Sequence, residues 1–219
     1  NKIKKLNITS FDLVLDLQTK LRNSFILKMI PHKTFISLCS FFKPNLNFKR
    51  EKKINNTVLK AVNALLNKNY QLNDFDIKKI DKKFFEEAKK LLPNENYVGL
   101  SVTQGNIYRK KQWPLDNIVK ISNKLIENKK KPVFFIEKKN QELKYKIEKL
   151  LPSALFPEHE SNLSSPALVT CLGQRLDFAV TIDNGVMHML SLSKVPMISL
   201  FGPTDSEKFA PQYENSIVL

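Results

Sequence analysis

The sequence predicts an α/β fold in which parallel strands alternate with helices. In the second half of the chain, short apolar runs with strand character are separated by segments whose apolar residues recur at helical spacing. A strand, a helix and a second strand also follow one another within the first 40 residues. Short strands that are split by helices pair in parallel, and helices then cover the sheet. We therefore expect a doubly wound α/β fold.

The first expected domain covers residues 1–93. Pro31 stops its first helix, and a polar, basic loop separates the initial β-α-β unit from two further helices. The turn residues at 93–96 mark the domain boundary. The expected elements are a strand at 11–17, a helix at 20–30, a strand at 34–38, a loop at 43–56, and helices near 55–67 and 79–92.

The second expected domain covers residues 94–219, and its strands and helices alternate regularly. One helix carries apolar residues at Leu143, Ile147, Leu150 and Leu151, so it buries a single stripe against the sheet. The expected strands are 97–102, 132–136, 178–182 and 196–201, and the expected helices are 115–127, 140–151, 166–176 and 186–193.

Composition indicates a globular protein of a reducing compartment. The 42% hydrophobic content suffices for a core, and charged residues interrupt every apolar run before the roughly 18 residues of a membrane span. Two isolated cysteines and three scattered histidines lack metal-ligand spacing, so no metal site is expected. The chain starts without a Met or a secretory signal, so we expect a fragment of a cytoplasmic protein.

The positive charge is concentrated in the first half of the chain. Residues 1–93 hold 20 Lys and Arg against 8 Asp and Glu, whereas residues 94–219 hold 16 against 13. Such a surface attracts nucleic acid, an anionic membrane or an acidic substrate alike. Lys and Asn are also abundant throughout, as an AT-biased genome would produce, so solvated lysines that keep the protein soluble explain the charge equally well.

The turn after the strand at 178–182 predicts an anion site. It reads Asp183-Asn184-Gly185, and Gly185 would let the backbone approach a ligand where the next helix begins. The N–H groups of a helix start favour negative charge, and His188 can donate to the same group. The alternative is that Asp183 caps the helix and His188 packs in the core.

Two further loops follow strands at the same edge of the sheet, where ligands bind in open parallel sheets. The first contains Thr103, Gly105 and Lys111, and Lys111 could neutralise a diphosphate. The alternative is that the basic residues of this loop are merely solvated and that Trp113 anchors the loop by packing. The second loop, Gly202-Pro203-Thr204, offers a hydroxyl and free backbone groups to a nucleotide.

Together these loops resemble the lipopolysaccharide heptosyltransferase family, glycosyltransferases of GT-B type with two Rossmann-like domains. Lys111-Gln112-Trp113-Pro114 is similar to the family's Lys-x-Trp-Pro element, and Asp183-Asn184-Gly185-Val186-Met187-His188 to its Asp-x-Gly-x-x-His element. Gly-Pro-Thr follows at 202–204. The likeness covers residues 97–211, and more weakly residues 11–18, where Asp16, Gln18 and the later Arg22 would lie on the acceptor side.

The resemblance implies transfer, with inversion and without a metal or cofactor, of a sugar from a nucleotide diphosphate donor, usually ADP-heptose. The acceptor would be a lipid-linked core glycan at the inner face of the inner membrane, and nucleic acid would not be a partner. The family's general base is an Asp after its very first strand, so we expect that base upstream of residue 1 and the first domain to be incomplete. Asp16 ends a later strand, so its position in the sequence does not assign it that role.

The same resemblance assigns the donor to Thr103, Gly105, Lys111, Asp183, Asn184, Gly185 and His188, with Gly202 and Thr204 as further contacts. The family has an acidic residue after the strand at 132–136, and here Glu137 and Glu142 both remain candidates. Asp74-Phe75-Asp76 mimics a metal-binding Asp-x-Asp element, but it precedes a Lys-rich helix and is expected to cap it.

Two other functions compete with this one. A non-catalytic Rossmann-like module could hold a nucleotide, nucleic acid or lipid through its basic half, but this needs aromatic residues exposed among the basic ones. A sugar-nucleotide epimerase would have a similar donor site, and the Trp113-Pro114 element argues against it.

Overall fold

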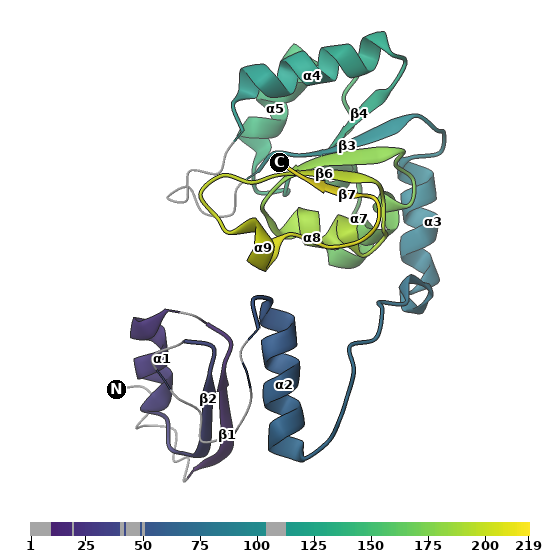
Figure 1. Ribbon diagram of the computed structural model, residues 1–219. Helices are drawn as coiled ribbons and strands as arrows, with labels where there is room; N and C mark the ends of the chain where they lie inside the picture. The colour runs from purple at the N-terminus through teal and green to yellow at the C-terminus, as the bar shows by residue number, and fades with distance from the viewer. Residues whose placement is uncertain (1–9, 19, 40–41, 43–48, 50, 104–112) are drawn as a thin grey trace. The chain divides into compact units, whose positions relative to one another are not determined.

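The computed structural model describes residues 10–18, 20–39, 42, 49, 51–103 and 113–219 (Figure 1). The chain forms two compact units, Asn1–Asp74 and Phe75–Leu219. Both contain parallel strands connected through helices. Within the described residues, no helix is both long enough and apolar enough to cross a bilayer.

The first unit contains the expected β-α-β arrangement. Strand β1 (Phe11–Asp16) and strand β2 (His32–Ser37) pair in parallel, with α1 (Leu21–Lys28) between them in sequence. The Phe42 ring meets the rings of Phe25 and Phe35 edge to face, at centroid distances of 5.1 and 5.6 Å. Helix α2 (Ile54–Leu66) follows and ends at Asn67, whose φ of 50° is a left-handed cap that Asn tolerates.

The second unit is a five-stranded parallel sheet with helices. Its strands are β3 (Tyr97–Ser101), β4 (Lys131–Phe134), β5 (Phe178–Ile182), β6 (Met197–Leu200) and β7 (Ser216–Val218). Its helices are the 3-10 turn η2 (Ile77–Lys79), α3 (Lys82–Leu91), α4 (Leu115–Glu127), α5 (Gln141–Leu150), α6 (Pro157–Glu160), α7 (Pro166–Gly173), α8 (Gly185–Ser191) and α9 (Ser206–Phe209).

The order of the strands identifies where a ligand would bind. The sheet runs β4-β3-β5-β6-β7, so the chain leaves β3 toward one edge and returns to place β5 on the other side of β3. In open parallel sheets the crevice at such a reversal, beyond the carboxyl ends of the strands, is the usual ligand site. Here it lies between the ends of β3 and β5.

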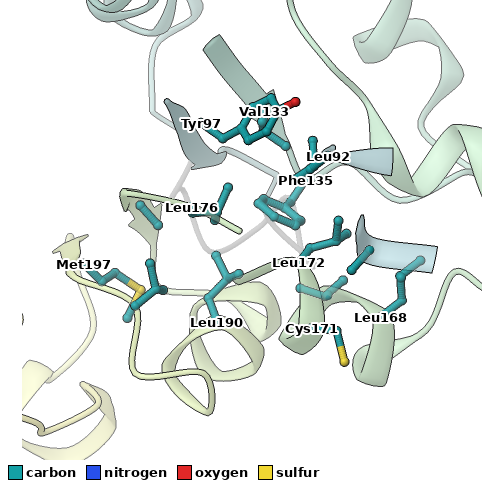
Figure 2. Close-up of a cluster of buried hydrophobic side chains, with 14 of the residues drawn as sticks. Leu92, Tyr97, Val133, Phe135, Leu168, Cys171, Leu172, Leu176, Leu190 and Met197 are labelled. Atoms are coloured by element: carbon teal, nitrogen blue, oxygen red, sulfur yellow. The ribbon is translucent and has the colours of Figure 1, made fainter. Parts of the chain in front are cut away.

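Alternating strand residues divide the core into two clusters, one on each face of the sheet. Figure 2 shows the first, which contains Tyr97, Val133 and Phe135 together with Leu168 and Leu172 of α7. The second contains the intervening strand residues together with helix residues from α4 and α5; its buried members are Val98, Leu100, Val102, Ile118, Phe134, Ile136, Ile147, Leu151, Phe156 and Val180. Helices therefore cover both faces, as the doubly wound fold class predicts.

Helix α3 belongs with the second unit. Its residue Ala88, and Leu92 directly after it, are buried in the cluster that also holds Leu168. The Arg175 side chain donates to the carbonyls of Leu92 and Asn94, at 3.0 and 2.9 Å. The compact units thus divide between Asp74 and Phe75, whereas the domain boundary expected from the sequence at 93/94 assigned α3 to the first domain. The apolar stripe of α3 packs against residues that follow the turn at 93–96 in the sequence, and this packing is not visible in the local sequence of the helix.

Local predictions differ from the structure where elements are short. Helix α6, helix α9 and strand β7 each have four or fewer residues, which is too few to establish a period. The stripe predicted on α5 is wrong at Leu150, which is 52% exposed, while Ile147 and Leu151 are buried. Asp76 caps the 3-10 turn η2 by accepting from the Lys78 N–H, whereas Asp81 caps the Lys-rich helix α3. The expectation that Asp74-Phe75-Asp76 caps that helix is therefore wrong.

Candidate functional site

Asn184 connects the two strands that flank the crevice. Its side-chain oxygen accepts from the Met187 N–H at 3.0 Å and so caps α8. Its amide nitrogen donates to the Ser101 hydroxyl at 2.7 Å and to the Thr103 carbonyl at 2.8 Å. An amide can do this because it carries both an acceptor and two donors. The alternative prediction that Asp183 caps the helix is wrong, since Asn184 holds that position.

Asp183 connects the same turn to the next loop along the sheet. Its carboxylate accepts from the Thr204 hydroxyl at 2.5 Å, and its N–H donates to the Leu200 carbonyl at 3.2 Å. Residues from three predicted loops are therefore linked side by side across β3, β5 and β6: Thr103 to Asn184, and Asp183 to Thr204. Gly202 lies in the third loop and is exposed.

A pocket of about 240 Å³ opens at the reversal of the sheet. Thr103, Asn184 and Gly185, three of the residues predicted to bind the donor, line it. Its other lining residues lie after β4, in α6, in and just before α7, and in α8: Glu137, Glu158, Ser164, Ser165, Pro166, Val169, Val186 and Met189. The wall thus combines apolar side chains with a few polar groups, the usual make-up of a small-molecule site.

Gly185 is a glycine for which the described packing gives no reason. A Cβ placed there would meet just the Met189 methyl, at the ordinary distance of 3.8 Å, and the backbone φ is not positive. Gly99 differs, because a Cβ there would lie 2.6 Å from Leu176 Cδ1. The open space over the start of α8 is available to a ligand that approaches the backbone.

Two glutamates approach the pocket from the β4 side. Glu158 is 7% exposed, and its Oε1 accepts a long 3.5 Å contact from the Ser164 hydroxyl. Its Oε2 has no hydrogen-bond partner among the described residues. Burial raises the pKa of Glu158, the charge of Glu137 raises it further, and the Ser164 hydroxyl lowers it. Glu137 is more exposed and forms an ion pair with Lys139.

Glu142, the other acidic candidate from the sequence, stands apart from the residues that line the pocket. It lies in the first turn of α5, its side chain is 82% exposed, and Lys146 binds it at 2.6 Å. The hydrogen bond from Lys146 lowers the pKa of Glu142, and the charge of the same lysine adds to this. Of the two candidates, Glu137 is the one that lines the pocket.

The remaining residues discussed for the donor loops fall into three classes. Gly105 and Lys111 lie outside the described residues. Trp113 packs against the second core cluster, as the anchoring alternative expects. His188 is exposed on α8, so the alternative in which it packs in the core is wrong. It is not among the residues that line the described pocket.

Within the first unit, Asp16 serves the fold. Its carboxylate is fully buried and accepts from the hydroxyls of Ser24 and Ser37, at 2.5 and 2.7 Å, and from the Gln18 N–H at 2.9 Å. These bonds tie the end of β1 to α1 and β2. Gln18 and Arg22, the other predicted acceptor-side residues, are exposed.

Sequence reasoning missed Glu158 and the serines beside it. Glu158 lies in a helix of four residues, where no period is readable. Ser165 caps α7 by accepting from the Leu168 N–H, and Pro166 follows at the first helical position. That Ser-Pro pair is a recognisable helix start, and helix starts next to strand ends are where ligand groups gather, so it is the signal that could have found this wall.

Comparison with solved structures places the fold. The structure of the glycosyl transferase family 9 from Veillonella parvula DSM 2008 superposes with a TM-score of 0.65 at 17% identity, covering 99% of this chain and 65% of that one. E. coli ADP-heptose lps heptosyltransferase II gives 0.63 at 16%, covering 100% and 70%. E. coli heptosyltransferase WaaC with ADP-2-deoxy-2-fluoro heptose gives 0.61 at 15%, covering 99% and 68%. These likenesses confirm the predicted α/β fold of GT-B type.

The sequence comparisons place the family. A search of the curated proteins found no match for this chain. The family model described as glycosyltransferase family 9 (heptosyltransferase) matches residues 2–219. That match spans both compact units and includes all three loops at the carboxyl edge of the sheet. The chain therefore belongs to glycosyltransferase family 9, the heptosyltransferase family.

Proposed function

We propose that this chain binds the donor of an inverting glycosyltransferase, which moves a heptose-like sugar from a nucleotide diphosphate to a lipopolysaccharide core or related glycan. The observation that carries this proposal is the pocket of about 240 Å³ between the carboxyl ends of β3 and β5. Family membership gives the reaction class. The chain spans 65% of the length of the Veillonella protein. The complete transfer reaction is therefore part of this proposal.

The donor is proposed to be an ADP sugar. The similar structures include E. coli heptosyltransferase WaaC with ADP and the same protein with ADP-2-deoxy-2-fluoro heptose. A nucleoside fits a largely apolar pocket with a few polar groups, and the sugar and diphosphate would extend along the edge of the sheet. Asp183, oriented by the Thr204 hydroxyl, is placed to accept from sugar hydroxyls.

The chemical step needs stabilisation of the charge that develops on the departing diphosphate. We assign this to Lys111 and His188 together with the first turn of α8, without a metal ion. Inversion also requires a general base for the acceptor hydroxyl. Asp16 is unsuited to that role, because its buried carboxylate already accepts from Ser24, Ser37 and Gln18. The base is therefore assigned to no described residue.

Isothermal titration with ADP tests the donor assignment. We expect the unaltered chain to bind ADP, and Lys111→Ala and His188→Ala each to weaken binding about tenfold, as loss of one charge-assisted hydrogen bond does. Lys120→Ala, an exposed lysine on α4, is the control and should bind as the unaltered chain does. Equal affinity in all variants would contradict the phosphate assignment, and absence of binding would contradict the donor site.

The acceptor side is proposed to meet an anionic membrane surface from the cytoplasm. The excess of Lys and Arg in residues 1–93 supports this, since each basic residue near an anionic surface adds about 1 kcal/mol of attraction. Cosedimentation with vesicles tests it. We expect more protein to pellet with anionic than with neutral vesicles, and less as salt rises. Equal pelleting with both would argue that the lysines serve solubility alone.

A further inference from the structure

Glu158 is held in place by the edge of the sheet. The residues just before it continue alongside β4, where the Phe134 N–H donates to the Leu155 carbonyl at 2.8 Å and the Leu155 N–H to the Pro132 carbonyl at 2.9 Å. The Phe156 ring then stacks on Phe134, with centroids 5.6 Å apart. A buried proline at position 157 begins the helix. The carboxyl of Glu158 is thus presented by a rigid segment.

The carboxyl is buried without adequate partners. Glu158 is 7% exposed, its Oε2 has no hydrogen-bond partner among the described residues, and its Oε1 has a contact of 3.5 Å from Ser164. Buried carboxyl groups are normally paired or hydrogen-bonded, because removing them from water is costly. An unpaired oxygen in the wall of a pocket is explained when a ligand supplies the missing donor.

The surroundings of Glu158 select the kind of donor. Glu137 lines the same pocket, so this wall carries two carboxyl groups and would repel a phosphate. Both follow β4, on one side of β3 in the sheet, while Asn184 and Gly185 follow β5 on the other side. The β4 side therefore suits an uncharged group with an N–H or O–H to donate. In a nucleotide sugar, such groups are the ribose hydroxyls and the amino group of the base.

We propose that Glu158 determines nucleoside specificity, its carboxyl oxygen accepting a hydrogen bond from an uncharged O–H or N–H of the donor's nucleoside. This inference rests on the proposed function. It adds a residue that neither the resemblance nor the Lys111 and Asp183 motifs indicate. Glu142, which the sequence offered as one candidate for contacting the donor, is exposed and paired with Lys146.

Titration of four proteins with ADP tests the role of Glu158. They are the unaltered chain, Glu158→Ala, Glu158→Gln and Glu160→Gln, the last being an exposed glutamate in the same helix. We expect Glu158→Ala to weaken ADP binding about 10- to 100-fold, the usual effect of losing a hydrogen bond to a charged group. Glu158→Gln should lose less, since its amide oxygen still accepts, and Glu160→Gln should bind normally.

Modified ligands identify the donating group. With 2′-deoxy-ADP, 3′-deoxy-ADP and inosine diphosphate, one ligand lacks the group that Glu158 binds. For that ligand the unaltered chain should lose affinity, and Glu158→Ala should cost nothing further. If a deoxy ligand gives this result, Glu158 binds a ribose hydroxyl. If inosine diphosphate gives it, Glu158 binds the amino group of the base. If Glu158→Ala costs the same factor with every ligand, direct recognition of the nucleoside is overturned.

Thermal unfolding without ligand separates binding from folding. A carboxyl kept for a ligand costs stability in the free protein, so Glu158→Gln should unfold at the same or a higher temperature. A lower unfolding temperature with unchanged ADP affinity would assign Glu158 to the fold and overturn the inference. Failure of the unaltered chain to bind ADP would overturn the proposed function, and this inference with it. ADP binding that is indifferent to Glu158 would overturn the inference alone.

Discussion

Each compact unit buries a carboxyl group, and the two groups differ in how far their hydrogen-bonding capacity is satisfied. In the first unit, Asp16 is fully buried and accepts three hydrogen bonds from its own chain. In the second, Glu158 is nearly as buried, yet one oxygen has no partner among the described residues and the group lines a pocket. A carboxyl whose acceptor capacity is filled locally stabilises the fold, whereas one left unfilled beside a cavity is available to a ligand.

The largest expected effect on stability is that of Asp16→Ala. It leaves the Ser24 and Ser37 hydroxyls and the Gln18 N–H without their acceptor in a buried site, so we expect a loss of about 3 kcal/mol in the free energy of unfolding. Urea unfolding followed by circular dichroism measures it. Asp12→Ala, which removes an exposed partner of Lys33 on the same strand, is the control. Equal stability of the two variants would break the comparison.

Two glycines give the next contrast. Gly99→Ala places a methyl 2.6 Å from Leu176 Cδ1 and 3.1 Å from the Phe135 ring, so overpacking should cost about 1–3 kcal/mol. Gly185→Ala meets no such contact and should leave stability unchanged or raise it by up to about 1 kcal/mol. Fluorescence of the single tryptophan, Trp113, can follow unfolding. Of the two variants, we expect only Gly185→Ala to fold normally and yet bind ADP about tenfold more weakly. Normal ADP binding by Gly185→Ala would contradict the idea that this glycine leaves room for a ligand.

The pH dependence of Glu158→Gln sharpens the comparison further. Burial, aided by the charge of Glu137, raises the pKa of Glu158 in the folded protein. The protonated form is therefore favoured by folding, and the associated stability is lost as pH rises from the unfolded pKa through the folded one. At pH 7 the amide should stabilise the protein by about 1 kcal/mol, or about 2–4 °C in Tm. That gain should vanish near pH 4; a gain that instead grew in acid would refute the sign.

The smallest expected effect is that of Glu142→Gln. Its carboxylate is 82% exposed and paired with Lys146, and exposed ion pairs contribute little to stability. The Tm should stay within about 1 °C of the unaltered value. Affinity for ADP should also remain unchanged, because Glu137 and Glu158 are the glutamates that line the pocket. A large loss of ADP affinity would instead assign a donor contact to Glu142.

Much of the fold followed from local patterns. The strand at 178–182 and the helix at 115–127 have the predicted bounds, because each is long or apolar enough for its period to be read. Helix α6, helix α9 and strand β7 were missed because each is too short for a period to be read. The boundary expected at 93/94 differs from the division into compact units. The sequence of α3 reveals its apolar stripe, but it does not reveal which hydrophobic cluster covers that stripe.

The candidate site divides in the same way. The sequence by itself determined the turn Asp183-Asn184-Gly185 and its place after a strand that precedes a helix, because turn chemistry and the succession of strands and helices along the chain are local properties. Only the tertiary structure decided that Asn184 binds Ser101 and that the Asp16 carboxylate accepts hydrogen bonds within the first unit. It also decided that Glu158 is buried beside a pocket, with Oε2 lacking a hydrogen-bond partner among the described residues. Burial and hydrogen-bond partnership join residues up to 83 positions apart, and no local pattern encodes which of them meet.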